Sequence, residues 1–171
     1  PDGAYYALQK DADIHVLNLN SNQLVNISDG TGISFVNAEH LYPHEKPPYG
    51  AAGWTKDGNS IILNHRFDLW SVKLDGSGGE NITQGLGDEL KTQFRYVNLN
   101  NDQPHIDTDQ PLLLRAFGEW TKKAGFYSLT LGKKPKELIF DDLAISSIRK
   151  AKNTDQIVFT KESFVEFPDY H

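Results

Sequence analysis

The sequence predicts an all-β chain, a β-propeller fragment of about three to four four-stranded antiparallel blades. A polar turn, an apolar run, a polar hairpin, a second apolar run and a closing Asn/Leu-Ile-Ser/Thr segment recur in degenerate form. Aspartates mark the polar turns at intervals of roughly 50 residues, a period typical of blade repeats; they are Asp2, Asp57, Asp109 and Asp155. Apolar and polar residues alternate along several short runs, as in half-buried strands.

Each blade is expected to contribute strands in a fixed order. Innermost strands are expected at residues 53–54, 96–99 and 148–151, and second strands at residues 4–8, 61–63, 112–114 and 157–159. Third strands are expected at residues 14–19, 69–74 and 126–131, with the start of another at residues 164–167. Outer strands are expected at residues 24–28, 80–83 and 136–140. Gly, Asn, Asp and Pro residues between these runs predict the connecting turns.

These strands predict one partial propeller domain, residues 1–171, made of blade pieces at about 1–50, 51–95, 96–145 and 146–171. The first residue is proline and the chain contains no methionine, so we expect a piece of a longer protein. Partial blades leave unpaired strand edges, which recruit other strands. We therefore expect residues 4–8 and 157–160 to pair with each other across a closed ring or with a neighbouring molecule.

Composition excludes several classes of partner. The net charge of -6 and the pI near 5.4 disfavour nucleic acid, which binds basic surfaces. No apolar run is as long as a membrane span, and no signal peptide is recognisable, so no membrane contact is expected. The absence of cysteine excludes disulfides and thiolate chemistry.

Four segments together carry a family resemblance. They are Pro-Tyr-Gly-Ala-Ala-Gly-Trp-Thr-Lys-Asp at residues 48–57, Asp-Leu-Trp at 68–70, Phe-Thr-Lys-Glu-Ser-Phe at 159–164 and Phe-Pro-Asp-Tyr at 167–170. Combined, they resemble the propeller of the prolyl oligopeptidase family, in particular the exported bacterial dipeptidyl aminopeptidases and acylaminoacyl peptidases. The resemblance spans most of the chain.

The resemblance implies a non-catalytic role. In that family the propeller caps an α/β-hydrolase domain, which carries the catalytic residues, and admits only short peptides. This chain has no Gly-x-Ser-x-Gly nucleophile elbow, and Ser77, in the Gly/Ser cluster at 76–79, lies between two expected strands. The paired-glutamate motif that holds a substrate amine is not recognisable either. We therefore expect no catalytic, cofactor-binding or metal-binding residue here. The implied partners are the parent's hydrolase domain and peptide substrates, in the periplasm or outside the cell.

Two other classes stay open. A TolB-like or WD-type propeller would act as a protein-interaction scaffold and belong to no enzyme. A glycan-binding or glycan-cleaving propeller would place carboxylates on its inner strands, but those strands offer Trp54, Asn98 and Arg149 instead. A Gly-x-Ser-x-Gly motif encoded downstream of His171 would distinguish the peptidase from the scaffold.

Two groups of side chains resemble metal ligands. His40, His44 and Glu45 would share a helix face, but Pro43, Pro47 and Pro48 disfavour a helix, so an exposed loop is expected. A second group, Asp102, His105, Asp107 and Asp109, offers donors for a hard cation. It lacks the glycine and terminal glutamate of a calcium loop, which favours a solvated turn before residue 112.

The remaining candidates for a functional role are two Asn-x-Ser/Thr triplets and the three tryptophans. Asn26-Ile27-Ser28 and Asn81-Ile82-Thr83 match the glycosylation pattern but occupy the same phase of the repeat, which shared strand ancestry explains. Trp54 and Trp70 lie at apolar repeat positions and are expected to pack between blades. Trp120 belongs to a polar hairpin at residues 118–123, where packing within a blade gives no reason for an aromatic. We predict that it contacts another domain or subunit.

Overall fold

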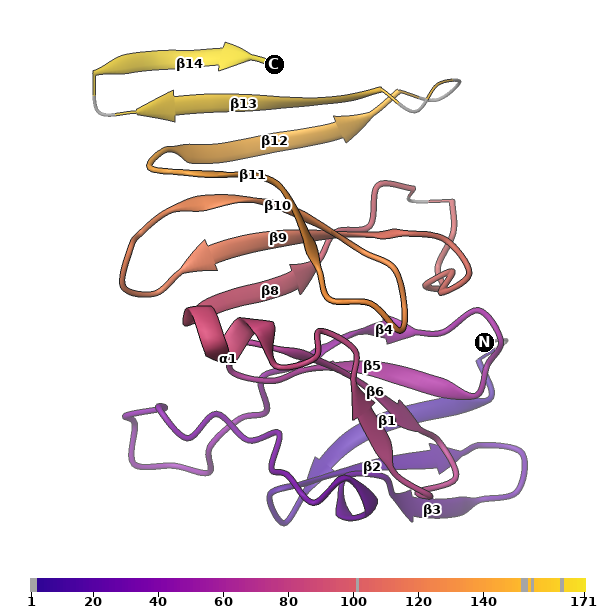
Figure 1. Cartoon of the computed structure of the whole chain (residues 1–171). Helices are drawn as coiled ribbons and strands as arrows, with labels where there is room; N and C mark the ends of the chain where they lie inside the picture. Colours follow the sequence, from indigo (N-terminus) through magenta and orange to yellow (C-terminus); the bar gives the residue numbers. More distant parts are fainter. Residues whose placement is uncertain (1–2, 101, 152–153, 155, 164) are drawn as a thin grey trace.

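The chain folds into four antiparallel sheets stacked in chain order, as shown by the computed structural model (Figure 1). The structure describes residues 3–100, 102–151, 154, 156–163 and 165–171. The first sheet contains β1 (Tyr5–Lys10), β2 (Asp13–Asn18) and β3 (Gln23–Asn26). The second contains β4 (Ala51–Trp54), β5 (Ser60–Asn64), β6 (Leu69–Lys73) and β7 (Gly79–Asn81). The third contains β8 (Thr92–Tyr96), β9 (Leu112–Gly118), β10 (Ala124–Leu129) and β11 (Lys136–Asp141). The fourth contains β12 (Ala144–Lys150), β13 (Ile157–Ser163) and β14 (Glu166–Tyr170). The predicted all-β class is confirmed.

Tight turns set the register within each sheet. The β1–β2 turn has positive φ at both central residues, 52° at Asp11 and 70° at Ala12. This geometry matches the right-handed twist of paired strands. It places Lys10 opposite Asp13 and Tyr6 opposite Leu17, so that one set of alternate side chains in β1 and β2 faces the second sheet.

Two apolar clusters hold the first three sheets together. The first cluster lies between the first and second sheets and contains Ile14, Val16, Ile27, Phe35, Ile61, Leu63, Val72 and Leu74. The second cluster lies between the second and third sheets and contains Ile62, Leu69, Ile82, Phe94, Ile106, Leu112, Leu114, Ala116, Tyr127 and Leu129. Because successive side chains of a strand point to opposite faces, the run of residues 61–63 serves both clusters. As predicted, Trp54 and Trp70 pack between sheets, against the first cluster.

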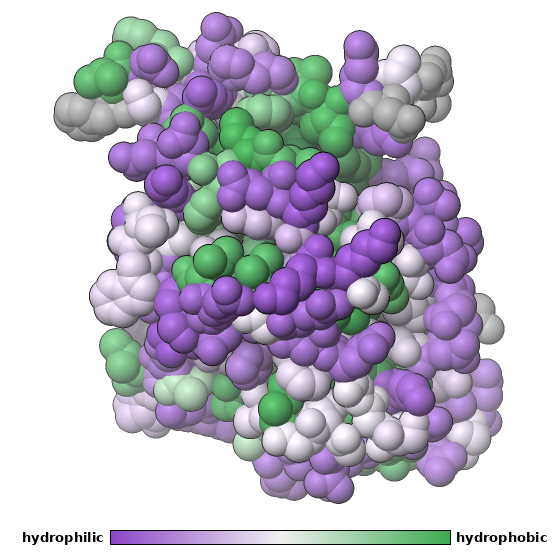
Figure 2. All heavy atoms as spheres, viewed as in Figure 1, coloured by the Kyte–Doolittle hydropathy of each residue, from purple (hydrophilic) through white to green (hydrophobic). Residues whose placement is uncertain are grey.

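The fourth sheet is covered on one face. Ile145 is buried, the rings of Phe126 and Phe159 meet at 5.7 Å, and Arg115 donates to the carbonyl oxygen of Ile145 at 2.9 Å. The last strand, β14, is exposed along its whole length, with Phe167 94% accessible. Figure 2 shows apolar residues at the surface near the top of the view, where the fourth sheet lies.

Two inner strands begin earlier than predicted. β8 ends at Tyr96, where residues 96–99 were expected to form the strand, because Asn98 starts a turn. Its side-chain oxygen accepts a hydrogen bond from the N–H of Asn100 at 2.9 Å, an arrangement that ends strands. β12 begins at Ala144, four residues before the predicted strand at 148–151, since Ile145 is buried against the third sheet. The third and fourth sheets therefore start at residues 92 and 144, and not near 96 and 146.

A short helix, α1 (Leu86–Leu90), was not predicted. It lies between β7 and β8, and a carboxylate remote in sequence holds its first turn. Asp68 accepts hydrogen bonds from the N–H groups of Gly87 at 3.0 Å and Asp88 at 3.3 Å. A 3-10 turn, η1 (Asp29–Thr31), follows β3.

The predicted ring closure is wrong for the described chain. β1 pairs with β2 alone, and β13 lies between β12 and β14, so residues 157–160 are not at an edge. Figure 1 shows the C-terminus at the far end of the stack from the first sheet. Pairing with a neighbouring molecule stays a prediction. The expected turn residues Asp2 and Asp155, and Phe164 at the start of the strand expected at 164–167, lie outside the described residues.

Candidate functional site

The two Asn-Ile-Ser/Thr triplets form the same hydrogen-bond network in successive sheets. In the first sheet, Ser28 Oγ donates to Asp13 Oδ1 at 3.1 Å and accepts from the N–H of Ile14 at 3.0 Å. In the second sheet, Thr83 Oγ1 donates to Asp68 Oδ1 at 2.6 Å and accepts from the N–H of Leu69 at 3.1 Å. Both hydroxyls are buried, so the triplets share a structural role as well as a phase.

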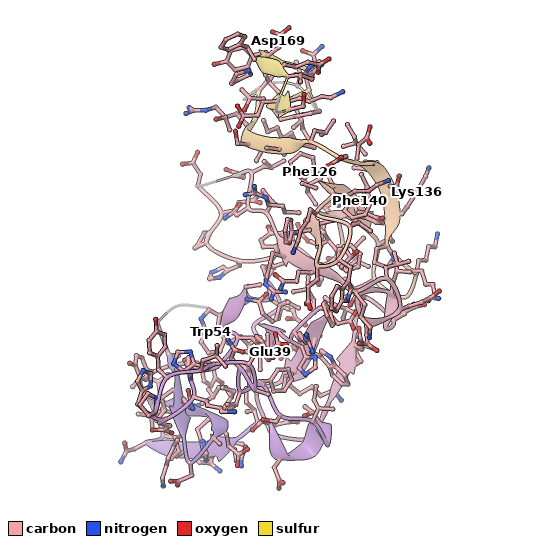
Figure 3. The ribbon with its side chains drawn as sticks, turned by 90° about the vertical axis from the view of Figure 1, so that its left-hand side faces the viewer. Glu39, Trp54, Phe126, Lys136, Phe140 and Asp169 are labelled. Carbon is pink, nitrogen blue, oxygen red and sulfur yellow. The ribbon has the colours of Figure 1, made fainter. Side chains whose placement is uncertain are left out.

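Loops from the first three sheets meet on one side of the stack, the left-hand side in Figure 1, which faces the viewer in Figure 3. Arg66, in the β5–β6 loop, lies between two carboxylates. Its Nη2 is 2.5 Å from Glu39 Oε1 and 3.1 Å from Glu119 Oε1. Glu39 follows β3 and Glu119 follows β9, so this one guanidinium ties together loops that are far apart in sequence.

Arg95 and Tyr49 complete this group, which we call the Arg66 cluster: Glu39, Tyr49, Arg66, Arg95 and Glu119. The Arg95 guanidinium donates to the carbonyl oxygens of Phe94 at 2.7 Å and Arg66 at 3.2 Å, and burial lowers its pKa. Burial and, as the next largest cause, the charge of Glu39 raise the pKa of Tyr49. The cluster therefore presents two cations, two carboxylates and a neutral phenol at neutral pH.

Unsatisfied polar atoms lie in this cluster and beside it. Arg66 Nε and Asn64 Oδ1 are buried and have no hydrogen-bond partner among the described residues. Such atoms are costly to bury unless water or a ligand satisfies them. Guanidinium groups bind carboxylates and carboxylates bind amines, so the cluster is suited to non-covalent recognition of charged groups. It contains no serine, threonine or cysteine nucleophile.

His65, beside the cluster, makes stability dependent on pH. Its ring meets Phe35 and Tyr49 edge to face, and burial lowers its pKa below the ordinary 6.5. As the pH falls below about 6.5, the unfolded chain takes up a proton at this residue before the folded chain does. The free energy of unfolding should therefore decrease as the pH decreases through that range. The variant His65→Phe should be less acid-sensitive between about pH 6.5 and 5, as measured by urea unfolding; an unchanged pH slope would contradict this role.

Trp120, the predicted interface residue, lies at the tip of the β9–β10 hairpin, next to Glu119. Its side chain is 77% exposed. The hairpin is fixed, because the N–H of Glu119 donates to the carbonyl oxygen of Lys91 at 2.9 Å and Gly118 donates to Lys123 at 2.9 Å. A large aromatic is thus held in solvent beside the Arg66 cluster, and its contact with a partner stays a prediction.

The histidine loop is irregular, as predicted. His40 Nε2 and His44 Nε2 approach to 3.4 Å, and the rings of His44 and Tyr42 stack. Glu45 is exposed and lies 3.5 Å from Gln9 Nε2. Among the described residues, no group of three or more His, Cys, Asp or Glu side chains could hold a metal ion.

The acidic loop between β8 and β9 is more than a solvated turn. Ile106 is buried, and it exchanges backbone hydrogen bonds with Trp54 at 2.8 Å and Lys56 at 2.9 Å. Asp107 pairs with Lys56 at 2.7 Å and accepts from the N–H of Asp109 at 3.2 Å, while Asp102 is exposed. His105 Nδ1 is buried without a partner among the described atoms. This loop docks the third sheet onto the second.

Grooves run between neighbouring sheets. One, of about 640 Å³, lies between the first and second sheets and is lined by Asn18, Gln23, Asp57, Asn59 and Asp75, among others. Another, of about 770 Å³, lies between the third and fourth sheets, with Arg115 and Lys122 as its basic lining and Asp142 and Glu162 as its acidic lining. Ser77 lies in the β6–β7 turn, where its N–H donates to Asp75 Oδ1 at 2.9 Å.

No family model matches the chain, and no curated protein or solved structure matches it. The fold and the site define the class as an all-β chain of four stacked antiparallel sheets with a charged cluster on one side of the stack. Within the described residues, no helix has both the length and the apolar character needed to span a bilayer.

Proposed function

We propose that this chain is the non-catalytic, substrate-gating portion of a prolyl oligopeptidase-family serine peptidase, with its sheets as propeller blades. The observation that carries the proposal is the repetition of one strand order through the stack. The strands of the second and third sheets both lie in chain order from one edge of the sheet to the other. The chain passes from the second sheet to the third through the segment that contains α1, and from the third to the fourth through residues 142–143. This is the connectivity of propeller blades.

The chemistry of the Arg66 cluster is compatible with gating. Peptides carry a cationic amino end and an anionic carboxyl end, and the cluster offers carboxylates and guanidinium groups for both. Because the ion pairs of Arg66 are partly exposed, they cost little to exchange for a ligand. A gate has to bind a peptide without cleaving it, and non-covalent binding by these charged groups meets that requirement.

The test combines a reactivity assay with a binding assay. The intact chain is treated with a fluorophosphonate probe and with aminoacyl and peptidyl chromogenic substrates, alongside a known serine peptidase. We expect neither labelling nor turnover, and equal results for Ser77→Ala. Covalent labelling lost in Ser77→Ala would overturn the non-catalytic assignment. A dipeptide titration should broaden or shift the NMR signals of Arg66 and Arg95, and failure to do so at millimolar concentration would overturn gating.

Trp120 favours a second candidate, a propeller that acts as a protein-interaction scaffold. A side chain that is 77% exposed on a fixed hairpin is typical of the anchors found in protein interfaces. The two candidates differ in partner: the peptidase presents Trp120 to its own hydrolase domain, and the scaffold presents it to another protein.

Trp120→Ala should leave the fold intact and remove most of the solvent-accessible tryptophan fluorescence. The free energy of unfolding should change by less than about 0.5 kcal/mol, because an exposed side chain contributes little to stability. Acrylamide quenching measures accessibility, and Trp54→Phe is the matched control, since Trp54 packs against the first apolar cluster. A loss of stability larger in Trp120→Ala than in Trp54→Phe would contradict the assignment of Trp120 to a surface.

A further inference from the structure

The histidine loop, residues 37–47, is closed at its base. The N–H of Asn37 donates to the carbonyl oxygen of Pro47 at 2.8 Å. Lys46 Nζ crosses the loop and donates to the carbonyl oxygen of Ala38 at 2.8 Å. A loop that is fixed in this way has less conformational entropy to lose when its side chains bind a ligand.

Two histidine side chains face each other within this loop. His40 Nε2 lies 3.4 Å from His44 Nε2, and the ring centroids are 4.7 Å apart. Both rings also contact Tyr42, at centroid distances of 5.3 and 6.0 Å, which helps to orient them. Proline disfavours a helix here, and the expectation of no metal ligand in this segment depended on that absence. The loop brings the two nitrogens together without a helix.

A backbone hydrogen bond selects the tautomer of His44 that can bind a metal ion. His44 Nδ1 lies 3.0 Å from the carbonyl oxygen of Glu45. A carbonyl oxygen can only accept, so Nδ1 carries the proton, and in the neutral ring Nε2 then presents its lone pair toward His40. Histidines that bind metals almost always donate a hydrogen bond from their other ring nitrogen in this way.

The separation of the two Nε2 atoms fits a shared metal ion better than a direct hydrogen bond. Hydrogen bonds donated by N–H are typically about 2.7 to 3.2 Å long, which is shorter than the 3.4 Å found here. Two nitrogens that each lie about 2.0 to 2.1 Å from one tetrahedral zinc ion are about 3.3 to 3.4 Å apart. Imidazole suits zinc, copper and nickel, whereas calcium and magnesium prefer oxygen ligands.

We propose that His40 and His44 bind one divalent transition-metal ion, zinc being the best fit, through their Nε2 atoms. The pair supplies two of the four tetrahedral positions, and water fills the other two. A site with two protein ligands agrees with the absence, among the described residues, of any larger group of metal-binding side chains. Glu39, which precedes His40 and is labelled in Figure 3, pairs with Arg66, so the ion would fix a residue beside the Arg66 cluster. This inference goes beyond the proposed function and does not depend on it.

The test is an NMR titration of the intact chain with zinc chloride, observed at the ring nitrogens of the six histidines. We expect saturable shifts at His40 and His44, with one zinc ion bound per chain, and no saturable shift at the other four histidines. Magnesium chloride should shift neither residue, because magnesium binds oxygen ligands. Shifts confined to other histidines, or no saturation at millimolar zinc, would overturn the proposal.

Two variants distinguish a shared ion from two independent contacts. Loss of a group that only supports a metal ligand costs about 10- to 100-fold in affinity, so His40→Asn and His44→Asn should each weaken zinc binding at least about tenfold. Because one nitrogen alone cannot chelate, the double variant should bind little more weakly than either single variant. His171→Asn is the matched control, since this exposed histidine lies outside the loop, and it should bind normally. Amide spectra that match the wild type outside residues 37–47 would show that the variants fold. Unchanged binding by either loop variant, or additive losses in the double variant, would overturn the proposal.

Discussion

Replacing Phe94 with alanine is expected to lower the free energy of unfolding by about 3 to 5 kcal/mol. The ring is fully buried between the second and third sheets and meets Tyr127 edge to face at a centroid distance of 5.0 Å. Its removal leaves a cavity in the apolar cluster that joins the two sheets. Domains of ordinary stability have only about 5 to 15 kcal/mol in total, so urea unfolding should show a large shift in midpoint.

Phe167→Ala is the control for this prediction. Phe167 lies on β14 and is 94% exposed, so its removal should change the free energy of unfolding by less than about 0.5 kcal/mol. Equal losses for the two variants would mean that the interface between the second and third sheets does not hold the stack together.

The strand pattern could be predicted because burial leaves a local trace in the sequence. Residues 61–63 form an uninterrupted apolar run because β5 is covered on both faces, and β2 alternates because its outer face is more exposed. The end of β8 was missed because the turn that starts at Asn98 competes with an apparent continuation of the strand through Val97 and Leu99.

Helix α1 could not be predicted, because its stability comes from outside its own sequence. Gly85 and Gly87 are poor helix formers, and Gly85 offers no side chain to cap the first turn. The cap comes from Asp68, about 20 residues earlier. Gly87 itself cannot carry a side chain, since a Cβ atom there would lie 2.7 Å from the carbonyl oxygen of Phe67.

Local sequence patterns could not predict the candidate site either. Glu39, Arg66 and Glu119 are single charged residues in separate loops, and Glu119 follows Arg66 by 53 positions in the sequence. Nothing in their neighbours distinguishes them from solvated surface charges. Trp120 was predictable for the opposite reason, since an aromatic residue in a polar hairpin conflicts with its surroundings. Its 77% exposure is consistent with that conflict.

Replacing Asp68 with alanine is expected to lower the free energy of unfolding by about 3 to 5 kcal/mol, the other large effect in this chain. Asp68 is buried and accepts hydrogen bonds from the hydroxyl of Thr83 at 2.6 Å and from the N–H groups of Gly87 and Asp88. Hydrogen bonds to a charged group contribute about 1.5 to 3 kcal/mol each, and the loss of Asp68 leaves the buried N–H of Gly87 without an acceptor. The hydroxyl of Thr83 keeps a second acceptor, Asn81 Oδ1 at 2.8 Å. Amide hydrogen exchange should show that α1 opens first.

The repeat provides a matched control, because Asp13 occupies the same position in the first sheet. Asp13 accepts from Asn26 Nδ2 at 2.9 Å and from Ser28 Oγ at 3.1 Å, but it is only partly buried and caps no helix. Asp13→Ala should therefore cost about 1 kcal/mol. The difference between the two variants measures the contribution of the α1 cap and of deeper burial. If both variants lost equal stability by urea unfolding, the cap on α1 would contribute nothing, and the shared Asp–Ser/Thr hydrogen bond would account for the whole effect.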